Sequence, residues 1–144
     1  MMRRLEPVVR DESPDWLLVY GDTNSTLAGA LVGAKLGIPV AHVEAGLRSF
    51  NRAMPEEINR IVADHVADTL FAPNEGTAKQ LATEGITRGV YVVGDVMADL
   101  AVAVAARLPE RPAVLERHGL RPHAYAVATI HRASNTDEDR KSVV

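Results

Sequence analysis

One stretch of the chain, residues 16–23, reads Trp-Leu-Leu-Val-Tyr-Gly-Asp-Thr. It begins with a short apolar run, which predicts a buried parallel strand, and it ends in a turn. A segment of helical period follows over about 24–36, and Gly37-Ile38-Pro39 ends it. Strand, turn and helix in this order make one βα unit, and the unit repeats along the chain. We therefore predict an α/β fold with a parallel sheet and flanking helices.

The same alternation of short apolar runs and helical segments continues along the sequence. Further strands are predicted at 40–43, 69–72, 90–93 and 125–130, and further helices at 55–68, 75–84 and 97–107. Residues 5–10 resemble the tail of a helix that leads into the first strand. We therefore expect an upstream βα portion to be missing from this chain.

A proline-rich segment interrupts the pattern after these helices. Its prolines are Pro109, Pro112 and Pro122. Such a segment is typical of a connection between two lobes. We expect residues 1–108 to form a partial first domain, 109–123 an interdomain linker and 124–144 the start of a second domain. A strand followed by the beginning of a helix cannot bury its own faces, so we expect this second domain to be truncated.

The composition is that of a soluble globular protein and excludes several kinds of function. The 144 residues are 47% hydrophobic and 24% charged, with a formal net charge of −3. A nucleic-acid surface needs many cations, and no long Lys/Arg run is present, so we expect no nucleic-acid partner. No segment fits a signal-peptide core or a membrane span, so we expect no membrane association and a cytoplasmic location. The lack of cysteine excludes disulfides and cysteine-containing zinc sites.

Ionisable residues follow three of the predicted strands at equivalent positions. Asp22 follows the first strand, Glu44 the second and His131 the last. The carboxyl ends of parallel strands lie at one edge of the sheet, where loops and helix N-termini bind ligands. Glu56 and Glu57 come in the loop and helix after Glu44. These residues are the candidates for a functional site.

Several of these residues also have a purely structural interpretation. Asp22 or Thr23 could cap the helix that follows, because their side-chain oxygens accept from first-turn amides. Glu56 and Glu57 could complement the dipole of their helix. Glu44 ends an apolar strand and has no evident packing role, which favours a functional one.

The other polar candidates are a histidine and a set of arginines. His131 fits a core histidine and a ligand contact equally well. Four arginines are available for phosphate or carboxylate pairing, with scattered surface charge as the alternative: Arg48, Arg52, Arg60 and Arg132. No Gly-x-Gly-x-x-Gly follows a strand and no Gly-Lys-Ser/Thr occurs, so no dinucleotide or ATP loop is indicated. The pattern His42-x-Glu44 lacks the cysteine pair of a zinc deaminase, and we predict no metal ligand set.

Several motifs in order and register resemble one enzyme family. They are GDTNST at 21–26, HVEAGLRS at 42–49, MPEEINR at 54–60, FAPNE at 71–75, VGDVM at 93–97 and TIHR at 129–132. Together they are similar to the non-hydrolysing UDP-N-acetylglucosamine 2-epimerases, over nearly the whole chain. The resemblance implies two Rossmann-like domains that face each other across a cleft, in a glycosyltransferase-B-like architecture.

The resemblance also implies a reaction. The family interconverts UDP-GlcNAc and UDP-ManNAc without nicotinamide or metal, so we expect no cofactor and a UDP-sugar substrate. The route is elimination of UDP to a 2-acetamidoglucal, followed by re-addition from the other face. Carboxylates can stabilise the oxocarbenium-like transition state and move the C2 proton, and His or Arg can offset charge on the leaving phosphate.

Matching the motifs residue by residue assigns roles to positions of this chain. The resemblance implies that Asp22, Glu44 and Glu56 are catalytic carboxylates, and that Asp22 and Glu44 also contact the substrate. His131 matches the histidine that approaches the UDP phosphates, as a substrate contact and electrostatic catalyst. Arg132 is a further substrate contact by its place beside His131.

The chain also departs from the family's pattern. Ser134 stands where the family continues its His-Arg motif with an acid. The family's Gly-Thr-Arg-Pro-Glu loop has no counterpart before Met1, and its Ser-Gly-Gly uridine-diphosphate site would lie past Val144. Because much of the substrate site is absent, we expect this polypeptide alone to be inactive or nearly so.

Other functions remain open at this level. A non-catalytic remnant or partial sugar-nucleotide-binding module would bind UDP-sugar weakly without exchange at C2. A hydrolysing epimerase or a glycosyltransferase-like enzyme is possible because fold alone does not decide chemistry. By resemblance the full-length protein is a homodimer whose product feeds a surface polysaccharide.

Overall fold

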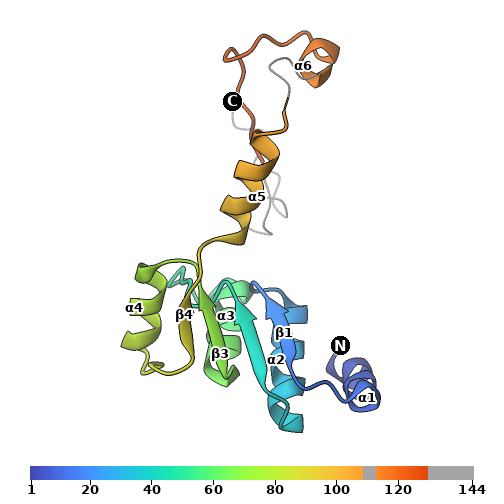
Figure 1. The fold of residues 1–144 in the computed structure, drawn as a ribbon, viewed down its shortest axis with the longest axis vertical. Coiled ribbons are helices and arrows are strands. Elements are labelled where there is room, and N and C mark those ends of the chain that lie inside the picture. The colour runs from blue at the N-terminus through green and yellow to red at the C-terminus, as the bar shows by residue number, and fades with distance from the viewer. Residues whose placement is uncertain (109–112, 130–144) are drawn as a thin grey trace. The chain divides into compact units, whose positions relative to one another are not determined.

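The computed structural model describes residues 1–108 and 113–129 (Figure 1). The chain divides into two compact units, Met1–Ala101 and Val102–Val144, and each is described by itself. The elements are α1 (Met2–Glu12), β1 (Leu17–Tyr20), α2 (Asn24–Leu36), β2 (Val40–Val43), α3 (Pro55–Val66), β3 (Thr69–Ala72), α4 (Glu75–Thr83), β4 (Val90–Val92), α5 (Val96–Ala105) and α6 (Ala113–Arg117).

The first unit contains a four-stranded parallel sheet, which confirms the predicted fold class. Its strands lie in the order β1-β2-β3-β4, so each strand lies beside the strand that precedes it in the sequence. The register pairs Val19 with His42, and His42 in turn with Leu70. Every arrow in Figure 1 points the same way, so the strands deliver their carboxyl ends to a single edge.

Helices α2, α3 and α4 pack on one face of the sheet. One apolar cluster joins Val19, Ala30, Val40 and Ala63, and a second joins Ala45, Leu70 and Leu81. Two glycines let α2 approach the strands closely. A Cβ atom at Gly33 would lie 2.6 Å from Val40 Cγ2, and one at Gly29 would lie 2.9 Å from Val19 Cγ1.

Among residues 1–108, side chains on the other face of the sheet and near its β1 edge are exposed. Leu18, Tyr20 and Tyr91 alternate with the core residues and are 47%, 60% and 57% exposed. A groove of about 910 Å³ runs beside β1 and is lined by residues of α1, β1 and α2. The helix suspected at residues 5–10 is α1, which ends at Ser13 in the left-handed conformation.

In the second unit, α6 buries Leu115. The strand predicted at 125–130 is not formed over 125–129, which is where the structure describes it. A strand needs a hydrogen-bonded neighbour, and these residues pair with no strand among the described ones. Within residues 1–108 and 113–129, no helix is long and apolar enough to cross a membrane.

Candidate active site

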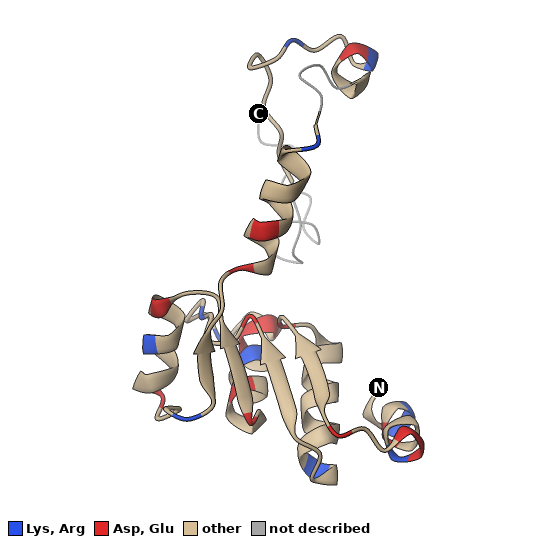
Figure 2. Ribbon diagram, viewed as in Figure 1, with Lys and Arg blue, Asp and Glu red and all other residues tan. Residues whose placement is uncertain are grey.

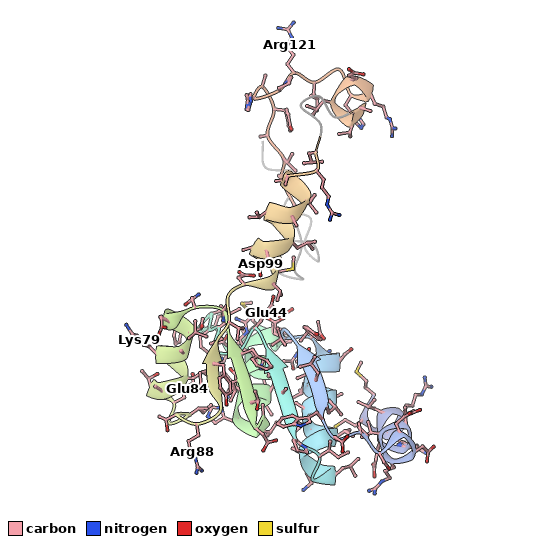
Figure 3. The ribbon with its side chains drawn as sticks, in the orientation of Figure 1. Glu44, Lys79, Glu84, Arg88, Asp99 and Arg121 are labelled. Carbon is pink, nitrogen blue, oxygen red and sulfur yellow. The ribbon has the colours of Figure 1, made fainter. Side chains whose placement is uncertain are left out.

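The carboxyl ends of β1 and β2 carry two of the predicted site residues. Gly21-Asp22 follows β1 directly, and Glu44 follows β2, the neighbouring strand. Acidic segments gather at the arrowhead end of these strands in Figure 2, and Figure 3 labels Glu44 at that edge. The parallel topology therefore brings Asp22 and Glu44 to one edge, as the sequence predicted.

Asp22 is anchored to α3 rather than used as a helix cap. Its carboxylate forms an ion pair with Arg60 Nη2, and its carbonyl accepts a hydrogen bond from Asn59 Nδ2 at 2.9 Å. The cap of α2 is Thr23, whose Oγ1 accepts from Thr26 N at 3.3 Å. The capping interpretation is thus correct for Thr23 and wrong for Asp22. The half-buried carboxylate of Asp22 instead pairs with Arg60 at the carboxyl end of the sheet.

Glu44 has an unusual backbone conformation, and within the described part of the chain its side chain is unpaired. Its φ of 69° lies in the left-handed region, where a residue with a Cβ is strained. Its Oε2 lies close to Gly21 in the turn after β1. A Cβ atom placed on Gly21 would be 3.3 Å from that oxygen. Among the described residues the Glu44 carboxylate forms no hydrogen bond or ion pair. Asp22 and Glu44 therefore flank the same glycine.

The two glutamates at the start of α3 divide into a buried one and an open one. Glu57 is 1% exposed and accepts from Ser49 N at 2.8 Å, Ser49 Oγ at 2.9 Å and Phe50 N at 2.9 Å. Burial acts to raise the pKa of Glu57, but these bonds and the charge of Arg60 outweigh it and lower the pKa. Glu56 is half-buried and has no hydrogen-bond partner in the described part of the chain.

The dipole interpretation is therefore incomplete for Glu57, which holds the loop between β2 and α3. Sequence reasoning missed this role because the three donors lie seven and eight residues upstream, in a loop without periodicity. Glu56, its neighbour, keeps a carboxylate available at the same end of the helix.

A buried ion network lies beneath this edge, and sequence reasoning also missed it. Asp64 of α3 is 1% exposed and accepts from His42 Nδ1 at 2.7 Å, Arg48 Nη1 at 2.7 Å and Gly46 N at 3.1 Å. Arg48 also holds Glu84 through Nε and Nη2, both at 2.7 Å. The network ties the loop after β2 to α3 and to the end of α4.

For two of the four arginines, the structure confirms the predicted pairing with carboxylates, and the surface-charge alternative is wrong for them. The Arg48 side chain is 2% exposed, pairs with two carboxylates and also donates from Nη1 to Leu47 O at 2.7 Å. Although burial opposes it, pairing with Glu84 and Asp64 raises the pKa of Arg48, and the Arg48 bond is the main cause that lowers the pKa of Glu84. Arg60 is 11% exposed and reaches both Asp22 and Glu57. Arg52 is exposed.

Arg60 lies at the centre of the carboxylate group. Its Nη1 is 3.5 Å from Glu57 Oε2, while its Nη2 meets Asp22. Its Nε is buried and has no hydrogen-bond partner among the described residues. The two predicted residues of the later motif, His131 and Arg132, lie outside the described residues, as does Ser134.

The arrangement offers three carboxylates in different electrostatic states. Asp22 is charge-neutralised by Arg60, whereas Glu44 and Glu56 have no partner in the part of the chain that the structure describes. A carboxylate in an ion pair usually contributes to the stability of the fold. An unpaired carboxylate at the carboxyl end of a strand is free to interact with a ligand. Such groups can take up a proton and can stabilise a developing cation.

Comparison with known proteins places these features in one family. A family model described as UDP-N-acetylglucosamine 2-epimerase matches residues 1–143. A UDP-N-acetylglucosamine 2-epimerase homolog of Methanococcus maripaludis is 50% identical over 139 residues, which are 95% of this chain and 39% of that protein. The UDP-2,3-diacetamido-2,3-dideoxy-D-glucuronate 2-epimerase of Pseudomonas aeruginosa is 48% identical over 141 residues, covering 96% and 38%.

The fold agrees with a solved structure from the same group. The UDP-GlcNAc 2-epimerase of Methanocaldococcus jannaschii, in complex with UDP-GlcNAc and UDP, superposes with a TM-score of 0.71 at 49% identity. The match covers 76% of this chain and 31% of that one. The chain thus spans about two fifths of the length of the curated relatives it matches.

Proposed function

Because the chain belongs to the UDP-N-acetylglucosamine 2-epimerase family, we propose that it supplies the catalytic carboxylates of a UDP-sugar 2-epimerase. The observation that carries the proposal is that Asp22, Glu44 and Glu56 lie at one end of the sheet, and that among the described residues Glu44 and Glu56 have no ion-pair partner whereas Asp22 pairs with Arg60. The substrate is UDP-N-acetylglucosamine and the product UDP-N-acetylmannosamine, which differ only in configuration at C2.

The reaction has two halves with opposite bond changes. In the first, the proton leaves C2 and the bond from C1 to the UDP oxygen breaks, which gives a 2-acetamidoglucal and UDP. In the second, UDP adds back to C1 and a proton is delivered to the opposite face of C2. No net oxidation occurs, so the reaction needs only acid–base groups and charge stabilisation.

Three carboxylates of this chain fit those needs. Asp22, Glu44 and Glu56 would stabilise positive charge on the ring and carry the C2 proton away and back. His131, with Arg132 beside it, would offset charge on the departing diphosphate. Residues 1–108 would be part of one Rossmann-like lobe and residues 124–144 the start of a second, with 109–123 between them.

The isolated chain is expected to turn over slowly or not at all. It spans only 39% of the length of its Methanococcus maripaludis relative, and the other lobe is needed to hold the diphosphate. Loss of positioning by about an ångström can cost on the order of a hundredfold in rate. The activity therefore has to be tested with the rest of an epimerase present.

The test is a chimera in which this chain replaces the matching segment of the Methanocaldococcus jannaschii enzyme. The assay incubates UDP-GlcNAc in D₂O and follows deuterium entry at C2 together with UDP-ManNAc formation by NMR. We expect exchange in the chimera, background exchange in the 144-residue chain, and a loss of about 100-fold or more for Asp22→Asn or Glu56→Gln.

The matched control is Glu6→Gln, because Glu6 is an exposed carboxylate of α1 whose only described partner is Arg10. It should leave the rate unchanged. A folded chimera that releases free sugar and UDP would indicate a hydrolysing enzyme instead. Transfer to an added acceptor without C2 exchange would indicate a glycosyltransferase, and binding without either would indicate a binding module.

A further inference from the structure

His42 is a fully buried histidine that the proposed reaction does not use. It lies on β2, on the sheet face covered by the helices, and is 0% exposed. Its Nδ1 is 2.7 Å from Asp64 Oδ1 on α3. Its Nε2 is 2.7 Å from the carbonyl oxygen of Gly21, which follows β1. One ring therefore links a neighbouring helix to the turn that precedes Asp22.

The acceptors on both sides of the ring decide where its hydrogens sit. A carbonyl oxygen can only accept, so Nε2 carries a hydrogen and donates it to Gly21. Asp64 Oδ2 accepts from Arg48 and from Gly46 N, and these donors favour an ionised carboxylate. Since an ionised carboxylate also only accepts, these partners favour a hydrogen on each ring nitrogen of His42.

The Gly21 carbonyl belongs to the peptide that leads into Asp22. Gly21 has a φ of 61°, and its own N–H donates to Val43 O at 3.0 Å. The next carbonyl, that of Asp22, is held by Asn59 Nδ2 at 2.9 Å. Side chains from β2 and α3 thus fix the peptide planes on both sides of the Asp22 Cα. The direction in which the Asp22 side chain leaves the backbone follows from these two planes.

We propose that His42 is a positioning residue for the Asp22 carboxylate. Clamped by Asp64, its ring fixes the peptide before Asp22, so that the carboxylate meets Arg60 at the sheet edge. The same clamp keeps Gly21 in place beneath Glu44, whose Oε2 lies next to it. The inference rests on the proposed function only in giving Asp22 a catalytic role, because the clamp itself is a property of this chain.

The clamp can be measured by nitrogen-15 NMR on the 144-residue chain without any substrate. At neutral pH we expect both ring nitrogens of His42 to show proton-bearing chemical shifts, with both ring hydrogens in slow exchange with solvent. A ring nitrogen with a free lone pair would overturn the proposal. This measurement needs no variant, so it does not depend on whether any substitution folds.

The positioning role is tested with His42→Leu, His42→Gln and Val40→Ala. His42→Leu removes both donors, whereas His42→Gln keeps an N–H group for the Gly21 carbonyl. Val40→Ala truncates another fully buried side chain of β2 and controls for lost packing. Arg60 Nη2 donates a hydrogen bond to Asp22 Oδ2. The readout is the exchange of the Arg60 Nη2 hydrogens with solvent, which we expect this bond to slow.

We expect this exchange to accelerate about tenfold in His42→Leu, to return toward the wild-type rate in His42→Gln, and to stay unchanged in Val40→Ala. Unchanged exchange in a folded His42→Leu chain would reject the proposal, and so would an equal acceleration in Val40→Ala. If His42→Leu does not fold, fast exchange in His42→Gln would reject it.

The chimera separates this inference from the proposed function. There, His42→Leu should lower kcat while KM changes little, because the residue orients a group and does not bind substrate. A wild-type chimera without C2 exchange would reject the proposed function, and the NMR result would still decide the clamp. Normal kcat in His42→Leu would reject the positioning role alone.

Discussion

The buried network around Asp64 and the carboxylate of Glu44 at the sheet edge both draw on the motif at 42–48, yet only the charges of the network are paired. His42 and Arg48 point inward, and each finds a carboxylate within 2.7 Å. Glu44, between them in sequence, points to the edge and has no partner among the described residues. The seven residues 42–48 thus contribute both to the interior network and to the candidate site.

The comparison shows how the chain keeps unsatisfied charge where a ligand can reach it. Satisfied charges in the interior fix the loop after β2, since Gly46 N also bonds Asp64. Glu44, in the same loop, has a left-handed backbone conformation with a φ of 69°. Glu44 thus has a strained backbone and an unpaired charge among the described residues, while its neighbours are paired, which agrees with the site role proposed for it.

The largest expected effect comes from removing the centre of the buried network. Asp64→Ala leaves His42, Arg48 and the Gly46 N–H without their acceptor, and we expect a loss of about 3–5 kcal/mol of unfolding free energy. Urea unfolding followed by circular dichroism at neutral pH measures this loss.

Asp22→Asn is the matched substitution at the edge. Its ion pair is 35% exposed on the aspartate side, so we expect a loss of about 1 kcal/mol or less. Similar losses for Asp64→Ala and Asp22→Asn would contradict the division between scaffold and site.

Sequence periodicity predicted most of the fold but not this network. The strands at 40–43 and 69–72 were predicted with the bounds that the structure has, because short apolar runs between turns signal buried parallel strands. The prediction of a strand at 125–130 is wrong over 125–129, because an apolar run forms a strand only beside a strand with which it can pair.

The candidate site was predicted in part for a related reason. Asp22 and Glu44 follow strands, and topology alone places strand ends together. The pairing of His42 with Asp64, 22 residues later, depends on how α3 lies over β2, which no local pattern encodes. Arg48 and Glu84 are 36 residues apart, and their ion pair could not be predicted from local sequence either.

An intermediate effect is expected at Glu57, which belongs to the scaffold although it lies next to Glu56. Glu57→Gln weakens the charge-assisted bonds to Ser49 and Phe50 and should cost about 1–3 kcal/mol near neutral pH. Urea unfolding between about pH 7 and pH 3 checks the size and its pH dependence.

The sign of that dependence follows from the lowered pKa of Glu57. A carboxyl group whose pKa falls below its ordinary 4.5 on folding stabilises the protein above that value. The stabilisation is lost as the pH falls through the lowered pKa. Wild type should therefore lose more stability on acidification than Glu57→Gln does, and parallel pH profiles would show that the Glu57 bonds carry no net stability.

The smallest effect on stability, with a large effect on catalysis, is expected at Glu44. Because its carboxylate has no partner in the described structure, Glu44→Gln should change the unfolding free energy by no more than about 0.5 kcal/mol. Glu44→Gly should be as stable as wild type or more so, since a left-handed backbone costs a residue with a Cβ about 1–2 kcal/mol and glycine little. Both variants should lose about 100-fold or more of C2 exchange in the chimera. A stable variant without activity at Glu44, set against an unstable one at Asp64, would separate the site from its scaffold, whereas strong destabilisation by Glu44→Gln would place Glu44 in the scaffold.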